Sequence, residues 1–155
     1  AILDAVQQHP FSRGLTAEHC ATLAGLAHRV GFAGEQIVFR EGDDRHEFFL
    51  LLSGRVALEM MSEGKPLRVH VLEGGDELGW SAVIMGRGKH FQARCLEPVE
   101  ALAFDGYSLL ERCRADTGFG YKLMHRLLGV VSERLQAARM QVLDSHSPIA
   151  KKAGA

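Results

Sequence analysis

Residues 46–61 read HEFFLLLSGRVALEMM, and this stretch decides the fold more than any other part of the chain. It is rich in Val, Leu and Phe, which favour β-strands, and Gly54 divides it into two short apolar runs. We therefore expect two strands that are broken at Gly54.

Segments of the same kind lie on both sides of this stretch. They are RVGFA (29–33), EQIVFRE (35–41), LRVHV (67–71), HFQARCL (90–96) and VEALAFD (99–105). Gly34 and Gly42 punctuate the earlier runs, and SEGKP (62–66) has the chemistry of a hairpin turn. Seven or eight short strands at this spacing indicate a sandwich, barrel or jelly roll, and the absence of long helices between them argues against a βαβ fold.

The segment LRVHV alternates strictly between apolar and polar residues. This pattern predicts a strand with Leu67, Val69 and Val71 on one face and Arg68 and His70 on the other.

Helical patterns flank the predicted strands. Thr16 can cap a short helix over residues 16–27, in which Cys20, Leu23 and Leu26 recur at helical spacing. YSLLERCR (107–114) predicts another short helix, and residues 119–146 predict a long one. The last residues, SPIAKKAGA, are typical of a disordered end.

The long predicted helix carries two apolar rows. The first steps by three and four residues, as the a/d seam of a dimeric coiled coil does, and consists of Tyr121, Met124, Leu128, Val131, Leu135, Ala138 and Val142. The second, Phe119, Leu123, Leu127 and Val130, covers the N-terminal half only. We expect the second row to pack on the β domain and the seam to meet a partner helix. The alternative is one wide apolar face that packs wholly within one subunit.

Length and composition favour one globular domain. The chain has 155 residues, of which 46% are hydrophobic and 24% charged. We expect no membrane span, because no apolar run approaches the length that one needs, and the N-terminus does not read as a signal peptide. The widely spaced Cys20, Cys95 and Cys113 favour a reducing compartment, which we expect to be the cytoplasm.

Charge is unevenly distributed along the chain. Residues 1–106 carry 10 Lys and Arg against 15 Asp and Glu, whereas residues 107–155 carry 8 against 4. A basic helix could contact phosphates, but a solvated outer face is the simpler explanation. The net charge of −1 indicates no general attraction to nucleic acid.

Three glycine-punctuated motifs resemble one family. GEQIVFREGD (34–43), FFLLLSGRVAL (48–58) and GGDELGWSAVIMG (74–86) resemble the turns of the cyclic-nucleotide-binding domain, as found in the catabolite-activator class of bacterial regulators. The resemblance covers nearly the whole chain, from about His9 to Asp144. It implies one domain over residues 1–155, mainly β with α: an eight-stranded antiparallel β-roll of jelly-roll, cupin-like type over about 28–105. A short N-terminal helix, a cassette helix, C-terminal helices over about 107–145 and a disordered tail over 146–155 complete it.

In that family, an insert between two late strands is a phosphate-binding cassette that usually reads FGE-x-A/S-L-L…R-S/T-A. Backbone N–H groups and an Arg hold the phosphate, and a Glu accepts a hydrogen bond from the ribose. The resemblance implies that the pocket wall of this chain consists of Leu78, Gly79, Trp80, Ser81, Ala82, Lys89, His90 and Phe91. Ala138 or Arg139 is expected to approach from the long helix.

This cassette departs from the family pattern at three positions. Trp80 stands where the Glu is expected, Lys89 where the Arg is expected, and His90 at the Ser/Thr position. Lys89 keeps a charge but lacks the planar fork of an arginine, and Arg87 is an alternative cation. Trp80 either plugs the vacated pocket as core or stacks on the ring of a different ligand.

The resemblance implies a non-catalytic regulatory domain that binds a small anionic or nucleotide-like ligand, possible ones being cyclic AMP and cyclic GMP, and signals through a homodimer of its long helix. The alternative is a ligand-free dimerisation or protein-interaction module with a degenerate cassette. The catabolite-activator class continues into a helix-turn-helix domain that reads DNA. Only about eleven residues follow Asp144 here, so we expect that the chain as given does not bind DNA directly. We expect it to be either a stand-alone sensor or a piece of a longer protein.

Enzymatic chemistry finds little support in the sequence. His46, His70 and His90 are isolated and do not form the paired histidines of a cupin metal site, so we expect no metal. No GxSxG, P-loop or GxGxxG motif occurs. The acidic pairs at 43–44 and 76–77 lie beside glycines, where they favour turns over acid–base catalysis. We therefore predict no catalytic residues.

Overall fold

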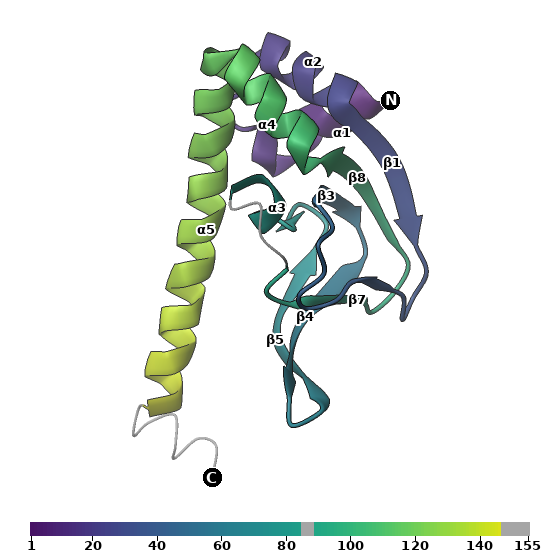
Figure 1. The fold of residues 1–155 in the computed structure, drawn as a ribbon, viewed down its shortest axis with the longest axis vertical. Coiled ribbons are helices and arrows are strands. Elements are labelled where there is room, and N and C mark those ends of the chain that lie inside the picture. Colours follow the sequence, from purple (N-terminus) through teal and green to yellow (C-terminus); the bar gives the residue numbers. More distant parts are fainter. Residues whose placement is uncertain (85–88, 147–155) are drawn as a thin grey trace. The chain divides into compact units, whose positions relative to one another are not determined.

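The computed structural model describes residues 1–84 and 89–146 (Figure 1). The chain divides into two compact units, Ala1–Lys122 and Leu123–Ala155, which are described separately. The prediction that residues 1–155 form one functional domain stays a prediction.

Eight strands form in the described part of the first unit, as the sequence predicts. They are β1 (Ala27–Phe32), β2 (Ile37–Phe39), β3 (Glu47–Ser53), β4 (Arg55–Ser62), β5 (Lys65–Glu73), β6 (Glu77–Leu78), β7 (Gln92–Cys95) and β8 (Val99–Asp105). Only the two-residue β6 has no counterpart among the runs that the sequence indicates.

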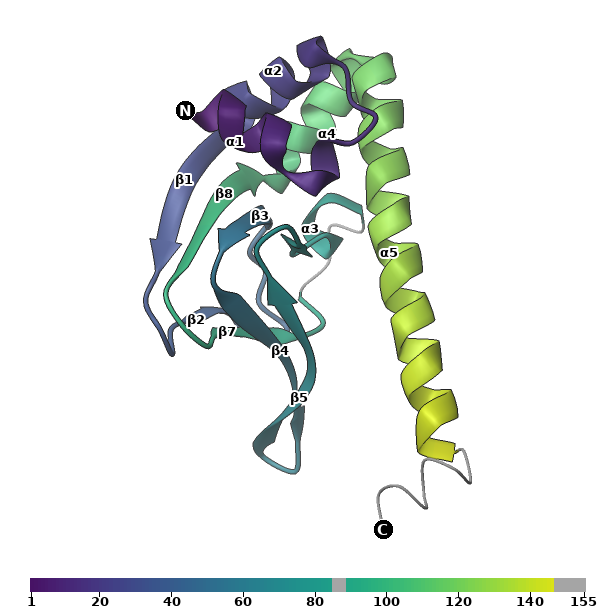
Figure 2. The same ribbon diagram turned by 180° about the vertical axis from the view of Figure 1, so that it is seen from behind.

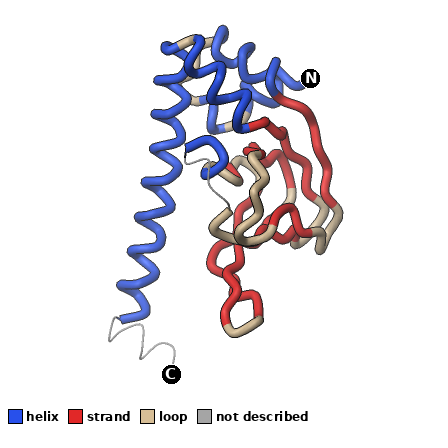
Figure 3. The backbone as a smooth tube through the Cα atoms, viewed as in Figure 1, coloured by secondary structure: helices blue, strands red, loops and turns tan. Residues whose placement is uncertain are grey.

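The strands form two four-stranded antiparallel sheets, coloured red in Figure 3. One has the order β1-β8-β3-β6 and the other β2-β7-β4-β5. Strands distant in sequence therefore lie side by side, as in a jelly roll. The predicted fold class, an antiparallel β-roll with helices, is confirmed.

The core lies between the two sheets. Phe49 and Leu51 on β3 pack there with Ala101 and Ala103 on β8 and with Val56 on β4, and all five side chains are at most 3% exposed. The alternate residues of the first sheet are buried on its other face. Burial on both faces explains why the β3 sequence is continuously apolar.

The other face of the first sheet packs against helical segments. The ring of Phe48 lies 5.7 Å from that of Phe11, in the 3₁₀ helix η1 (Pro10–Ser12), and 6.0 Å from that of Phe104. Helices α1 (Ile2–Gln8), α2 (Ala17–Leu26) and α4 (Gly106–Ala115) gather at this end of the roll (Figure 2). The Thr16 side chain accepts a hydrogen bond from the His19 amide, so the predicted N-cap is confirmed.

The β4–β5 hairpin projects beyond the neighbouring strands (Figures 1 and 2). Its tip is a two-residue turn at Glu63 and Gly64, both with positive φ, which suits the twist of the flanking strands. Val69 is left out of the pairing, because Leu58 pairs with His70 and the next residue, Glu59, pairs with Arg68. This bulge turns the following side chains to the opposite face. The prediction that Leu67, Val69 and Val71 share one face of the strand is therefore wrong.

The helix α5 (Thr117–His146) begins in the first unit and continues through the second. Of the predicted seam, Leu128, Leu135 and Val142 are 64%, 63% and 59% exposed, and Tyr121 is also exposed. A row of large apolar side chains on one helix face is thus open to solvent in the single chain. Its pairing with a second copy stays a prediction.

Candidate functional site

The predicted cassette connects β6 to a short helix, α3 (Ser81–Ile84). Gly79 makes the turn between them with a φ of +84°. A Cβ at this position would lie 2.7 Å from the carbonyl oxygen of Glu47 and 3.0 Å from the Nζ atom of Lys89. The turn therefore requires glycine for its backbone conformation and for the close approach of β3.

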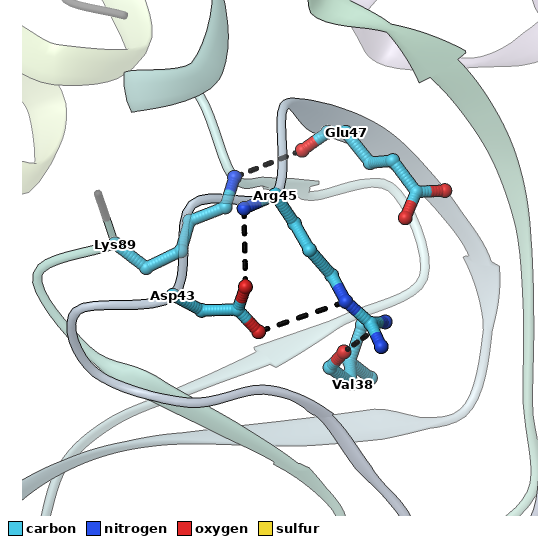
Figure 4. A network of polar contacts seen from close by, with 5 residues as sticks. All are labelled: Val38, Asp43, Arg45, Glu47 and Lys89. Atoms are coloured by element: carbon cyan, nitrogen blue, oxygen red, sulfur yellow. Dashed lines mark hydrogen bonds and ion pairs between the residues drawn. The ribbon is translucent and has the colours of Figure 1, made fainter. Parts of the chain in front are cut away.

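Lys89 lies at the other end of the cassette and is only 3% exposed. Its Nζ atom donates to the carbonyl oxygen of Glu47 at 2.9 Å, shown in Figure 4, and lies 3.5 Å from that of Gly79. The same atom is 4.8 Å from the centroid of the Phe39 ring. We call these three neighbours of the ammonium group, two carbonyls and one aromatic face, the lysine cage.

The loop before β3 holds the backbone of Lys89 in place. The Lys89 amide donates to the carbonyl oxygen of Asp43, and the Lys89 carbonyl accepts from the amide of Gly42. The Asp43 carboxylate accepts from the backbone amide of Arg45 and lies 3.6 Å from its guanidinium (Figure 4). Asp43 thus stabilises a turn, as its position beside a glycine predicts.

Burial sets the protonation of Lys89. Loss of hydration lowers the pKa of its ammonium group from 10.5 to about 8, and the carboxylates of Glu47 and Asp43 oppose this effect. The cage supplies carbonyl dipoles and a ring face but no carboxylate contact. A substantial fraction of the side chains is consequently neutral just above physiological pH.

The lowered pKa predicts a pH-dependent stability. Between pH 8 and 10.5 the unfolded chain binds more protons at Lys89 than the native chain does, so the free energy of unfolding rises with pH. We expect a gain of roughly 2–3 kcal/mol across this interval. Denaturant unfolding of the wild type and Lys89→Met at each pH measures it.

The methionine variant serves as the reference for this comparison. Burial raises the pKa of the Cys95 and Cys113 thiols, which lowers stability above pH 9 in both proteins. The difference between the two proteins therefore isolates Lys89. A difference that stays constant from pH 7.5 to 10.5 would contradict the assignment.

The other predicted pocket residues are placed differently. Leu78 is buried in the core, and Phe91 packs against the same cluster, so both side chains support the roll. Ser81 is 5% exposed at the start of α3, whereas His90 is exposed. Trp80 is half-buried, and its carbonyl accepts hydrogen bonds from the first turn of α3. The structure thus brings Gly79 and Lys89 together, with Trp80 adjacent in the chain.

Some predicted site residues cannot be placed at the cassette from the described residues. Arg87 lies outside the described residues, as does the predicted tail from residue 147 onward, and the Ala82 side chain is not described. Ala138 and Arg139 belong to the second unit, so their approach to the cassette stays a prediction.

Two partners of Lys89 were not expected from the sequence. Phe39 reads as an ordinary strand residue, and Glu47 contributes its backbone carbonyl, which no side-chain pattern indicates. Only the pairing of β3 with β6, Phe49 opposite Leu78, brings this carbonyl to the cassette.

A further groove lies among the described residues. Over residues 1–84 and 89–146, no group of three His, Cys, Asp or Glu residues could hold a metal ion. A groove of about 300 Å³ is lined by Leu26, Ser108, Glu111, Arg112 and Ala115 and contains no predicted pocket residue. None of the helices in the described part of the chain is long and apolar enough to span a membrane.

A comparison with known families matches the part of the chain that contains the cassette. The profile of the family described as the cyclic nucleotide-binding domain matches residues 29–116, which is more than half of the chain. The match begins within β1 and includes the other seven strands, the cassette and α4. No curated protein sequence matches the chain.

Solved structures show the same fold. A putative cyclic nucleotide-binding protein from Geobacter metallireducens is 25% identical, with a TM-score of 0.76 over 85% of this chain and 96% of that one. A cyclic nucleotide-binding domain from Methylobacillus flagellatus is 17% identical, with a TM-score of 0.81 over 94% and 83%. The catabolite activator protein of Thermus thermophilus is 21% identical, with a TM-score of 0.72 over 86% of this chain and 61% of that one.

Proposed function

Because the chain belongs to the cyclic nucleotide-binding domain family, we propose that it is a non-catalytic sensor domain for a small anionic ligand. The observation that carries the proposal is the retained cassette: a tight turn at Gly79, a short helix and a buried cation, Lys89, beside the turn. A buried ammonium group is a strong partner for an anion, because water does not screen the interaction. Cyclic AMP and cyclic GMP are the first ligands to test.

The side chains around the cation modify the ligand preference. Lys89 contributes a point charge and no planar fork, so it holds a phosphate with less geometric selectivity than an arginine would. Trp80 occupies the position from which a Glu would accept the ribose hydroxyl. The half-buried indole offers a face on which a base or another ring stacks. We therefore propose that the site accepts anions attached to a planar ring.

We propose that the signal leaves through α5. The exposed seam on this helix gives a second copy of the chain a surface on which to pair. A ligand that favours one arrangement of two paired helices would shift the equilibrium between arrangements, and this coupling is the output of the sensor. The buried, unpaired Cys20 and Cys95 fit a reducing compartment, for which we propose the cytoplasm.

A second candidate function is a ligand-free dimerisation or interaction module. It is favoured by the cage, because the ammonium group of Lys89 already donates to carbonyl groups of its own chain. In this case the cassette is a structural remnant, and only the α5 seam carries the function.

Titration of the sole tryptophan separates the two functions. We expect cyclic AMP, cyclic GMP or another ring-bearing anion to change the Trp80 emission in a saturable way, because Trp80 adjoins the cassette turn. A ligand at about 100 times its dissociation constant should stabilise the fold by about 2.7 kcal/mol, which calorimetry records as a rise in melting temperature.

The variant Trp80→Phe is the control for this titration. It should abolish the emission signal and keep the rise in melting temperature. If neither signal changes with any ligand of the panel, the ligand-free module is the correct function.

A further inference from the structure

Lys89 extends the contact between β3 and β6 by one further step. The paired residues of these strands are Phe49 with Leu78 and Leu50 with Glu77. Beyond the end of this ladder, the ammonium group of Lys89 lies between the carbonyl oxygens of Glu47 and Gly79. A side chain, in place of a backbone pair, therefore connects the cassette turn to the roll.

The lysine cage uses the donors of this ammonium group. A lysine has three N–H donors, and the cage provides two carbonyl oxygens and the face of the Phe39 ring. An anion that binds Lys89 must therefore replace at least one of these neighbours. The longer contact, 3.5 Å to Gly79, is the weaker of the two hydrogen bonds and the easier to replace.

We infer that Lys89 is a latch: in the free protein its ammonium group holds the cassette turn against β3, and an anionic ligand opens the cassette by drawing this group out of the cage. The inference rests on the proposed function, since it concerns how the proposed ligand acts on the same site. Ligand binding and movement of the cassette thereby become one event, which a sensor needs in order to report occupancy.

The surrounding charges keep the latch closed without a ligand. Burial disfavours the charged form of Lys89, and the carboxylates of Glu47 on β3 and of Asp43 in the preceding loop oppose this effect. The Arg45 guanidinium pairs with Asp43, and His90 follows Lys89 in the chain as an exposed residue. An incoming anion must overcome repulsion from two carboxylates, so anions that bind weakly should leave the latch closed.

The first test removes the latch. In Lys89→Met the side chain still fills its place against Phe39, but it cannot bridge the two carbonyls. We expect the acrylamide quenching constant of Trp80 to rise at least about twofold, with no fall in melting temperature because a buried charge is removed. The matched control, Lys65→Met, replaces an exposed lysine of β5 and should leave the quenching unchanged.

A second measurement keeps the test decisive if the variant folds poorly. Because burial in the cage lowers the pKa of Lys89, deprotonation favours the closed latch, so the quenching of the wild type should stay level or fall between pH 7 and 9.5. Quenching that rises with pH in the wild type, or that is unchanged in a folded Lys89→Met, would overturn the latch.

A third measurement follows the latch during binding. In protein carrying ¹³C-labelled lysine, the Cε protons of Lys89 should be shifted upfield by the Phe39 ring, and cyclic AMP should return them to the ordinary lysine position. The signal is assigned by its loss in Lys89→Met. If calorimetry detects cyclic AMP binding and this signal does not move, the latch is wrong and the sensor function stands. If cyclic AMP does not bind, the cyclic-nucleotide form of the proposed function fails, and the quenching measurements still decide whether Lys89 holds the cassette.

Discussion

Replacing Gly54 with alanine should destabilise the roll by about 3–5 kcal/mol, the largest loss that we expect from any single methyl group. Gly54 joins β3 to β4 with a φ of +89°. An added Cβ would lie 2.4 Å from the carbonyl oxygen of Pro98 and 2.8–2.9 Å from atoms of Val99. The nearest contacts involve backbone atoms at the start of β8, which cannot move without disturbing the sheet.

The control for Gly54→Ala is Gly64→Ala. Gly64 also has a positive φ, +78°, but no atom lies within 4 Å of the position of its Cβ. The loss of stability in Gly64→Ala should therefore be limited to the backbone strain of about 1 kcal/mol. Urea unfolding of the three proteins measures both effects, and equal losses at the two positions would show that the clash with β8 contributes nothing.

The substitution Leu135→Asp should convert the proposed dimer into monomers. Leu135 occupies an a/d position of the predicted seam and is 63% exposed in the single chain. Pairing of two seams would bury a carboxylate without a partner, so we expect the dimer dissociation constant to rise at least about 100-fold. Sedimentation equilibrium over a range of protein concentrations measures this change.

The matched control, Gln136→Asp, introduces the same charge one residue further along, outside the a/d positions. It should leave the dimer intact, because an exposed carboxylate at this position remains hydrated. A wild-type chain that sediments as a monomer at every concentration would refute the seam, and α5 would then require another role.

Much of the roll could be predicted, because its apolar runs and turns are local signals. The runs that flank Gly54 became β3 and β4, and the hairpin chemistry of residues 62–66 became a two-residue turn. The Gly34 break is displaced by one position: Glu35, with a φ of 68°, adopts the left-handed conformation. A glycine in the sequence thus marks the turn but not which of its residues carries the strain.

Two features of the fold could not be predicted from local patterns. The bulge at Val69 reverses the faces of β5, and a strict alternation gives no sign of it. Helix α1 has no clear signal in the sequence, because Ile2–Gln8 is short and its N-cap, Ala1, makes no side-chain hydrogen bond. Each depends on neighbours that are distant along the chain or on weak local preferences.

The cassette, too, could be predicted only in part from the sequence. Its turn at Gly79 and the adjacent lysine were expected from the motif, whereas the burial of Lys89 was not. The cage forms from a strand residue, Phe39, and a backbone carbonyl, that of Glu47. Such partners become visible only once the strands are paired, so the sequence indicates the charge but not its surroundings.

The order of the strands also has a consequence for biosynthesis. Strand β1 has β8 as its neighbour, with Ala27 opposite Phe104. On the ribosome, β1 emerges first among the strands and must wait for the last before its edge is paired. Closing so long a loop is slow, and contacts of this separation reduce folding rates. The β4–β5 hairpin, whose strands are adjacent in the chain, can form while synthesis continues, and the closure of β1 on β8 completes the roll.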